Sequence, residues 1–280
     1  MDDPKALYLD LMKKVLTHSL YPDNLTMAGM FDKTTSSESF SAKRVAREIA
    51  ASVLARTNYS LMKKKEYDPQ ARAEGRDWPT FAHTMIGLKR LDNLQFCVED
   101  ALRRNVPGDL IETGVWRGGS AIFMRAVLKA CGVKDRTVWV ADSFEGLPAP
   151  DANYPADAGS ELHTYPILKV SEEQVRANFE SYGLLDSQVK FLKGFFKDTL
   201  PKAPIETLAV LRFDGDMYGS AMDVFNSLYD KLSIGGFIVV DDYGAVPACK
   251  QAVHDFRNAR NITEPIEAID WTGVYWQRTR

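Results

Sequence analysis

The chain has 280 residues, of which 45% are hydrophobic and 26% are charged. This length and composition allow a sizeable buried core and exclude a disordered chain, a coiled coil and a collagen-like repeat. The 35 Lys and Arg residues against 38 Asp and Glu residues give a net charge of −3, which argues against nucleic acid as the main partner. No apolar run approaches the ~18–20 residues of a membrane-spanning helix, so we expect no membrane partner.

The cysteines and the N-terminus indicate the compartment. Cys97, Cys131 and Cys249 are widely spaced and form no CxxC pair, which disfavours a disulfide framework or a zinc site. The first residues, MDDPKALYLDLMKKVL, are acidic and amphipathic, whereas a signal peptide begins basic and then turns apolar. We therefore expect a soluble protein of the reducing cytoplasm.

Residues 1–78 contain helical patterns but no recognisable catalytic chemistry. Apolar residues recur at roughly helical spacing in the first segment, and a Ser/Thr-rich stretch follows at 34–39. A second helical run spans about 42–61 and is followed by three lysines at 63–65, which we interpret as a solvated helix end. The pattern predicts an N-terminal helical extension that acts as a lid or an oligomer contact.

Residues 79–280 read as an α/β domain. A period of three to four residues predicts a helix over 83–104, and Pro107-Gly108 ends it. Short apolar runs then alternate with helical patterns, at 110–111, 138–140, 189–192, 208–211 and 237–240. The first helix between them covers 121–130 with Ser120 as its N-cap, and late strands are expected at 266–269 and 274–276. This alternation predicts a doubly wound, mostly parallel sheet.

Acidic residues gather where these strands end. Ligands of an open parallel sheet bind at the carboxyl ends of its strands, so the residues at those ends are the first candidates for a site. Six of them are acidic: Glu112, Asp142, Asp214, Asp216, Asp241 and Asp242. Such a concentration indicates a binding site rather than simple solvation.

A glycine-rich loop follows the first strand. Gly114, Gly118 and Gly119 have the spacing GxxxGG, which is neither the dinucleotide GxGxxG nor the P-loop. A carboxylate such as Glu112 beside the loop repels phosphate and suits a cationic ligand. Asp142, at the end of the next strand, can accept both ribose hydroxyls of a nucleoside. A nucleoside with a cationic centre and no phosphate is S-adenosylmethionine, which we favour over a dinucleotide.

Three aspartates follow two further strands of the predicted sheet. Asp214 ends one strand, and Asp241 and Asp242 end the next. Neighbouring strands lie about 4.8 Å apart, so the three carboxylates can converge, and they repel one another unless a cation or protonation neutralises them. Hard oxygen ligands suit Mg²⁺, with Ca²⁺ or Mn²⁺ as alternatives. The competing interpretation is that Asp241-Asp242 only caps a turn before Tyr243.

The histidines give weaker signals. We interpret His83, His163 and His254 as surface or hydrogen-bonded side chains. Of the three, His163 lies in a polar loop over 159–165 and is the candidate for a substrate contact, together with Tyr243.

Several strings of the chain resemble the macrocin O-methyltransferase family, the metal-dependent sugar O-methyltransferases of antibiotic tailoring that include the enzymes finishing the mycinamicin and novobiocin sugars. The matching covers about 7–15 and then 74–280. Residues at about 27–67 depart from it, because this sequence is longer there. The strings are HTMIG at 83–87, PGD at 107–109, ETGVWRGG at 112–119, VWVADSF at 138–144, FKDTLP at 196–201, DGD at 214–216, DDY at 241–243 and GVYW at 273–276.

The resemblance implies a class I S-adenosylmethionine-dependent methyltransferase with a Rossmann-like fold. It implies that Asp214, Asp241 and Asp242 ligate Mg²⁺ and that Asp216 is the general base. It also implies a glycosylated natural product as acceptor and a homo-oligomer, dimeric or tetrameric. Thr84 and Met85 would contact the methionine part of the cofactor. The other cofactor-binding residues it implies are Glu112, Gly114, Ser120, Asp142, Ser143 and Asp214, with Gly194, Phe195 and Phe196 near the adenine.

Other functions remain open at this point. The same ligands would serve a phenol or catechol acceptor, since a catechol also chelates a metal. A nicotinamide-dependent oxidoreductase could use a similar sheet, but it would need GxGxxG and has no use for three clustered aspartates. A non-catalytic binding module would keep the fold and lose the acidic positions, which are all present.

Overall fold

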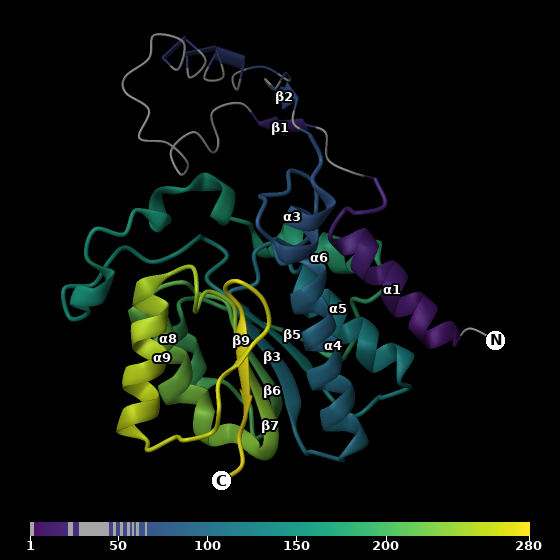
Figure 1. Cartoon of the computed structure of the whole chain (residues 1–280), viewed down its shortest axis with the longest axis vertical. Coiled ribbons are helices and arrows are strands. Elements are labelled where there is room, and N and C mark those ends of the chain that lie inside the picture. Colours follow the sequence, from purple (N-terminus) through teal and green to yellow (C-terminus); the bar gives the residue numbers. More distant parts are fainter. Residues whose placement is uncertain are drawn as a thin grey trace.

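The computed structural model describes residues 3–21, 25–27, 45–46, 49–50, 53–54, 57, 59, 62–64 and 66–280. Figure 1 shows the strands of one sheet running between two groups of helices. The strands of this sheet are β3 (Asp109–Thr113), β4 (Val138–Asp142), β5 (Val189–Lys193), β6 (Leu208–Phe213), β7 (Leu232–Val240), β8 (Glu267–Ala268) and β9 (Val274–Gln277). The helices are α1 (Pro4–Leu16), α3 (Pro69–Glu74), α4 (Leu88–Arg103), α5 (Gly119–Ala130), α6 (Glu172–Ser181), α7 (Phe196–Thr199), α8 (Tyr218–Leu228) and α9 (Pro247–Ala259).

The sheet has the order β5-β4-β3-β6-β7-β9-β8. The five strands from β5 to β7 pair in parallel, and β9 pairs antiparallel with both β7 and β8. Because helices cover both faces, the central strands are largely apolar rather than alternating: β6, for example, is buried at all of its positions and is apolar except at Arg212. The predicted doubly wound, mostly parallel sheet is confirmed.

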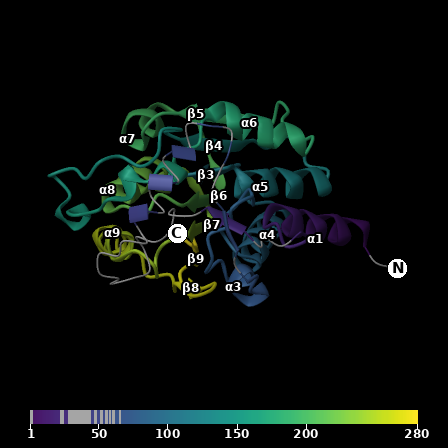
Figure 2. The same cartoon turned by 90° about the horizontal axis from the view of Figure 1, so that it is seen from above.

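The helices form a layer on each face of the sheet. The apolar side chains of α1, α4, α5 and α6 join one hydrophobic cluster, in which Phe123 and Phe179 are fully buried. Those of α8 and α9 join a second cluster on the other face, around Phe225 and Trp276. Figure 2 shows the two groups of helices on opposite sides of the sheet. Within the described residues, no helix has the length and apolar character needed to cross a membrane.

The first helix and α3 pack onto this body. Leu9, Met12 and Leu16 of α1 are buried in the same cluster as α5. The buried Arg72 of α3 donates to the backbone carbonyl of Ile86 at 3.0 Å and also contacts that of Met85. The division of the chain near residue 78, and a role of the N-terminal part as lid or oligomer contact, stay predictions.

Two predicted helix starts are wrong. The helix expected from 83 begins at Leu88, after Gly87 as N-cap, and a Cβ at Gly87 would come within 2.2 Å of a backbone oxygen. The N-cap of α5 is Gly118 rather than Ser120. Gly118 has φ +86°, a left-handed conformation that favours glycine over serine. The helix therefore begins at Gly119 instead of at residue 121, and Ser120 lies buried inside its first turn.

The lysine run is also different from the prediction. Met62–Lys64 forms the short strand β2, antiparallel to β1 (Leu25–Met27), so Lys63 and Lys64 do not close a helix. They are exposed, as the solvated interpretation required. Residues 45–46, 49–50 and 53–54 are helical. The remainder of the predicted run over 42–61, and the Ser/Thr-rich stretch at 34–39, lie outside the described residues.

A long connection leaves the carboxyl end of β4. Residues 143–171 lie between β4 and α6 and contain three short 3₁₀ turns, η1 (Pro155–Asp157), η2 (Leu162–Thr164) and η3 (Pro166–Leu168). Figure 1 shows it, in teal, extending beyond the ends of α8 and α9. We call this segment the β4–α6 connection. It lies at the edge of the sheet where the acidic strand ends gather.

Candidate active site

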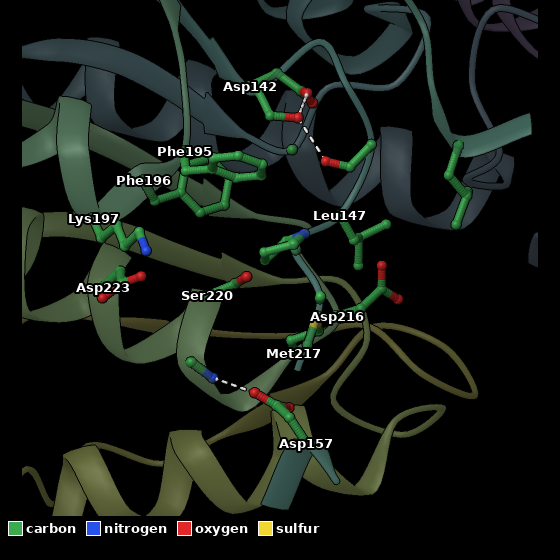
Figure 3. Close-up of a pocket in the computed structure, with 18 of the residues that line it drawn as sticks. Asp142, Leu147, Asp157, Phe195, Phe196, Lys197, Asp216, Met217, Ser220 and Asp223 are labelled. Atoms are coloured by element: carbon green, nitrogen blue, oxygen red, sulfur yellow. Dashed lines mark hydrogen bonds between the residues drawn. The ribbon is translucent and has the colours of Figure 1, made fainter. Parts of the chain in front are cut away.

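A cavity of about 350 Å³ opens at the carboxyl edge of the sheet. Its walls come from the glycine loop, the ends of β4 and β6, the start of α7 and α8, and the β4–α6 connection (Figure 3). The cavity lies at the edge of the sheet where the sequence placed the candidate site residues. The predicted site residues that line the cavity are Met85, Gly114, Asp142, Ser143, Phe195, Phe196, Asp214 and Asp216.

Close backbone approach explains the glycine loop. Gly114 has φ +86°, and a Cβ there would lie 1.7 Å from the carbonyl oxygen of Asp214. A Cβ at Gly119 would lie 2.4 Å from the carbonyl oxygen of His83. The loop thus brings three separate segments together at one point: the residues after β3, those after β6 and those before α4.

Glu112 is a buried carboxylate, and only one of its two oxygens accepts a hydrogen bond from Arg212. This oxygen, Oε1, accepts from Arg212 at 2.7 Å. The other, Oε2, is buried and has no hydrogen-bond partner among the residues that the structure describes. Burial raises the pKa of Glu112 to about 8, against the opposing effect of Arg212. Thr84, also buried, lies against Gly119, and Ser120 lies near Glu112. An unpartnered carboxylate oxygen beside a tight loop fits a cationic ligand group.

Asp142 is fixed in place by backbone groups. Its Oδ2 accepts from the amide of Val115 at 2.8 Å and its Oδ1 from the amide of Phe144 at 2.7 Å. Burial raises its pKa, and these amides oppose that effect. A carboxylate has about four lone-pair sites, so Asp142 can still accept from ligand hydroxyls. Ser143 beside it donates to the carbonyl of Gly146 at 2.6 Å and so shapes the start of the connection.

Aromatic side chains provide an apolar wall. Phe195 and Phe196 line the cavity (Figure 3). They follow Gly194, whose φ of +132° turns the chain from β5 into α7. Gly194 itself does not line the cavity. Flat, apolar rings next to a hydroxyl-accepting carboxylate suit a planar base joined to a sugar.

The three aspartates converge. Asp214, Asp241 and Asp242 each offer one carboxylate oxygen, and these oxygens lie within 4.8 Å of one another. Asp242 keeps a buried oxygen, Oδ2, that has no hydrogen-bond partner within the described part of the chain. Burial, with Asp216 and Asp214 next, raises the pKa of Asp242 well above its usual range. The negative charges of Asp216 and Asp214 add to the effect of burial. A cluster of carboxylate oxygens of this kind is a donor set that fits a hard divalent cation.

Asp216 lies beside this cluster and lines the cavity. Burial, followed by the charges of Asp214 and Asp241, raises its pKa to about 7. Its backbone has φ +55°, a left-handed conformation that non-glycine residues adopt uncommonly. The residue is therefore held in a defined position by the chain on either side of it.

Two buried arginines complete the site, and neither is among the residues predicted from the sequence. Arg212 of β6 donates to Glu112 and, at 2.8 Å, to Oδ2 of Asp214, and it also contacts Asp241. Arg90 of α4 contacts Asp241 and donates to Asp270 at 3.0 Å. The sequence contained a sign of Arg212, because this charged residue interrupts an otherwise apolar strand directly before Asp214. Arg90 left none, because its partners are distant in sequence.

The structure does not bring the two predicted substrate residues to the cavity wall. His163 is exposed in η2, and the hydroxyl of Tyr243 bonds with Nε2 of His254 at 2.8 Å. Neither lines the cavity, and their substrate role stays a prediction. His83 is half-buried and its Nδ1 bonds with the hydroxyl of Tyr182 at 2.7 Å. His83 and His254 are thus hydrogen-bonded, as expected.

Comparison with known proteins gives the same picture. Residues 5–278 match the family described as macrocin-O-methyltransferase (TylF). The chain is 51% identical over 280 residues to an 8-demethyl-8-(2,3-dimethoxy-alpha-L-rhamnosyl)-tetracenomycin-C 4'-O-methyltransferase of Streptomyces olivaceus, covering 99% of this chain and 95% of that protein. It is 48% identical over 277 residues to the mycinamicin III 3''-O-methyltransferase of Micromonospora griseorubida, covering 98% and 96%.

A solved structure agrees over the whole length. The structure of the O-methyltransferase NovP superposes with a TM-score of 0.83 at 48% identity, covering 99% of this chain and 100% of that one. The family match, the curated relatives and this structure all concern the same activity. The chain therefore belongs to the macrocin O-methyltransferase family and is an S-adenosylmethionine-dependent O-methyltransferase.

Proposed function

We propose that this enzyme transfers a methyl group from S-adenosylmethionine to a sugar hydroxyl of a glycosylated natural product, with the help of Mg²⁺. The observation that carries the proposal is the convergence of Asp214, Asp241 and Asp242 beside the cavity, with one buried oxygen of Asp242 unpartnered. Two relatives named for 4'- and 3''-O-methylation of tetracenomycin and mycinamicin compounds support the acceptor class.

The cofactor supplies an electrophilic methyl group on its sulfonium sulfur. In the proposal, Glu112 binds the cationic amino group through its unpartnered oxygen, and Thr84, Met85 and Ser120 surround the methionine part. Asp142 and Ser143 hold the ribose next to Gly114, and Phe195 and Phe196 pack on the adenine, with the turn at Gly194 directing them toward it. These groups fix the methyl group in line with the acceptor oxygen, and such alignment provides much of the rate enhancement of a bimolecular transfer.

Mg²⁺ bound at the trio would act as a Lewis acid and as a template for two neighbouring hydroxyls. Asp214, Asp241 and Asp242 would hold it. Asp216, which lines the cavity next to them, would take the proton of the acceptor hydroxyl as that oxygen attacks the methyl carbon. General bases of this kind contribute roughly 10²–10⁴-fold in rate. The same groups would serve a catechol, so the acceptor class needs its own test.

Calorimetric titration tests the cofactor and metal sites. S-adenosylmethionine and S-adenosylhomocysteine are titrated with Mg²⁺ and with a chelator, into the wild type and Asp241→Asn. We expect micromolar cofactor binding in both proteins and a Mg²⁺ site only in the wild type. Failure of either cofactor to bind would contradict the proposal, and Mg²⁺ binding retained by Asp241→Asn would remove the trio as the metal site.

An acceptor panel tests the substrate class. Mycinamicin III, the demethylated tetracenomycin rhamnoside and a simple catechol are incubated with the enzyme, S-adenosylmethionine and Mg²⁺. Methylation of a glycosylated compound but not of the catechol supports the proposal, and the reverse result would favour a phenolic acceptor. We also propose that the enzyme is a homo-oligomer and that residues 1–78 help to build it. Size-exclusion chromatography gives the oligomeric state, and the same methylation assay on the separated fractions shows which state is active.

A further inference from the structure

A buried carboxylate joins the β4–α6 connection to helix α8. Asp157, in η1, is 3% exposed. Its Oδ1 accepts from the amide of Tyr218 at 2.7 Å and its Oδ2 from the amide of Gly219 at 2.9 Å. Figure 3 shows Asp157 directed at the first turn of the helix. Both oxygens of this aspartate are therefore used on a helix that begins 61 residues later.

Helix α8 has no cap of its own. Its N-cap residue is Met217, which makes no side-chain capping bond. The first amides of a helix have no partner inside it, and a negative charge at that end is further stabilised by the helix dipole. Asp157 provides both the missing acceptors and the charge. Hydrogen bonds to an ionised acceptor are about twice as strong as neutral ones.

Packing beside this pair depends on a glycine. A Cβ at Gly219 would lie 2.6 Å from Cδ2 of Tyr154, a ring of the same connection. The rings of Tyr154 and Tyr218 are 5.7 Å apart between centroids. The connection is thus held on α8 by two hydrogen bonds from backbone amides and by ring contact, at a position where any side chain would have to displace Tyr154.

The contact between Asp157 and the first turn of α8 lies next to Asp216. Asp216 comes two residues before Tyr218 and has the uncommon φ of +55°. On its other side, the amide of Asp214 donates to the carbonyl of Thr113 at 2.9 Å, which fixes the end of β6. A left-handed conformation is unfavourable for a non-glycine residue and persists only when its surroundings hold it. The amide of Met217 donates to the carbonyl of Gly215 across this turn. Thr113 supports the turn on the β6 side, and Asp157 supports it on the α8 side.

We propose that Asp157 is a positioning residue that couples closure of the β4–α6 connection over the cavity to the alignment of Asp216. The proposal rests on the role of Asp216 as base given above. Leu147, Tyr154 and Asp157 of the connection all line the cavity, so a ligand beneath it contacts the seated segment. When the connection leaves α8, the helix loses the side chain that caps it, and the turn at Asp216 loses the support that the capped helix gives on its C-terminal side.

Hydrogen exchange on the full chain tests the coupling without any ligand. The wild type is compared with Asp157→Asn, Asp157→Ala and Glu161→Gln, the last removing an exposed charge from the same connection. Asn offers a single acceptor oxygen, so it retains at most one of the two hydrogen bonds from the amides of Tyr218 and Gly219. We expect faster exchange both in 147–166 and in 216–222 for the two Asp157 variants, and no change for Glu161→Gln. Faster exchange in 147–166 alone would overturn the proposal.

Kinetics with the best acceptor of the panel give the second readout. Misplacement of about 1 Å can cost 10²-fold in rate, so we expect kcat to fall between tenfold and a hundredfold in Asp157→Asn, with less than about threefold change in the dissociation constant of S-adenosylhomocysteine. Gly219→Ala keeps the Asp157 carboxylate but places a Cβ 2.6 Å from the Tyr154 ring and 3.4 Å from Oδ2 of Asp157, so it should loosen the same contact and likewise lower kcat more than cofactor affinity. Unchanged kcat in both variants would overturn the positioning role.

Asp216→Asn separates this proposal from the function on which it rests. Retained turnover in Asp216→Asn would show that Asp216 is not the base, which is a failure of the proposed function. In that case the exchange experiment still decides whether Asp157 holds the turn.

Discussion

Single residues decide the charge balance at this site. Arg212 is 1% exposed and lies among Glu112, Asp214 and Asp241. The surrounding carboxylates raise its pKa against the opposing effect of burial, so it stays charged. A buried ion pair contributes little compared with an apolar pair, but removing one partner is costly because the other charge remains buried. Arg212 is therefore needed mainly to neutralise the buried carboxylates around it, and its ion pairs add little net stability to the fold.

Replacing this arginine should destabilise the protein strongly. We expect Arg212→Met to lower the free energy of unfolding by about 3–5 kcal/mol, the cost of leaving buried charges unpaired. Arg260→Met is the matched control: Arg260 pairs with Asp230 at 2.8 Å on the surface, where an ion pair contributes at most about 1 kcal/mol. Urea unfolding at neutral pH measures both. If Arg212→Met lowered the free energy of unfolding as little as Arg260→Met does, the buried carboxylates would already be neutral in the wild type.

At the scale of elements, apolar patterning predicted the sheet well. A buried parallel strand reads as a continuous apolar run, and each run expected from 110 to 240 lies within a strand of the structure. Helix starts were less predictable. Gly118 caps α5 because the loop requires a left-handed residue there, a tertiary constraint that no capping preference encodes. The strand at Met62–Lys64 was missed because its partner, Leu25–Met27, is distant in sequence.

The site was predictable for a related reason. Residues at the carboxyl ends of parallel strands meet at one edge, so Asp142 and the three aspartates could be grouped from their positions alone. Arg90 and Asp157 could not be predicted. Arg90 acts from a helix and Asp157 from an irregular connection, and in both the side chain meets partners that only the folded chain brings close.

The glycine loop permits a prediction about one element boundary. Gly114→Ala places a Cβ 1.7 Å from the carbonyl oxygen of Asp214, so the ends of β3 and β6 must separate. We expect loss of S-adenosylhomocysteine binding and a large drop in unfolding free energy. Gly132→Ala is the control, since Gly132 has a similar φ of +70° with nothing within 4 Å. It should cost only about 1–2 kcal/mol for the left-handed backbone, and equal stability and binding in both variants would refute the steric argument.

At the scale of the whole molecule, stability depends on pH through buried groups in the helical layer as well as through the acidic edge. His83 lies between α1 and α6, where its Nδ1 bonds with Tyr182 and its carbonyl accepts from Gly119 at 3.0 Å. Burial, with Arg117 and His18 adding, lowers the pKa of His83 below its ordinary value of 6.5. The imidazole is therefore neutral in the folded chain at pH values where the unfolded chain binds a proton.

This difference has a definite sign. Because the unfolded chain binds more protons, the contribution of His83 to stability is present above pH 6.5 and is lost as the pH falls through the folded pKa. Urea unfolding at pH 7.5 and 5.5 should show a smaller loss of stability in His83→Gln than in the wild type, since Gln stays neutral and can still bond with the Tyr182 hydroxyl. His163→Gln, which alters an exposed imidazole, should follow the wild type. If His83→Gln lost as much stability as the wild type, the buried imidazole would not contribute to acid sensitivity, and the acidic edge would have to account for it.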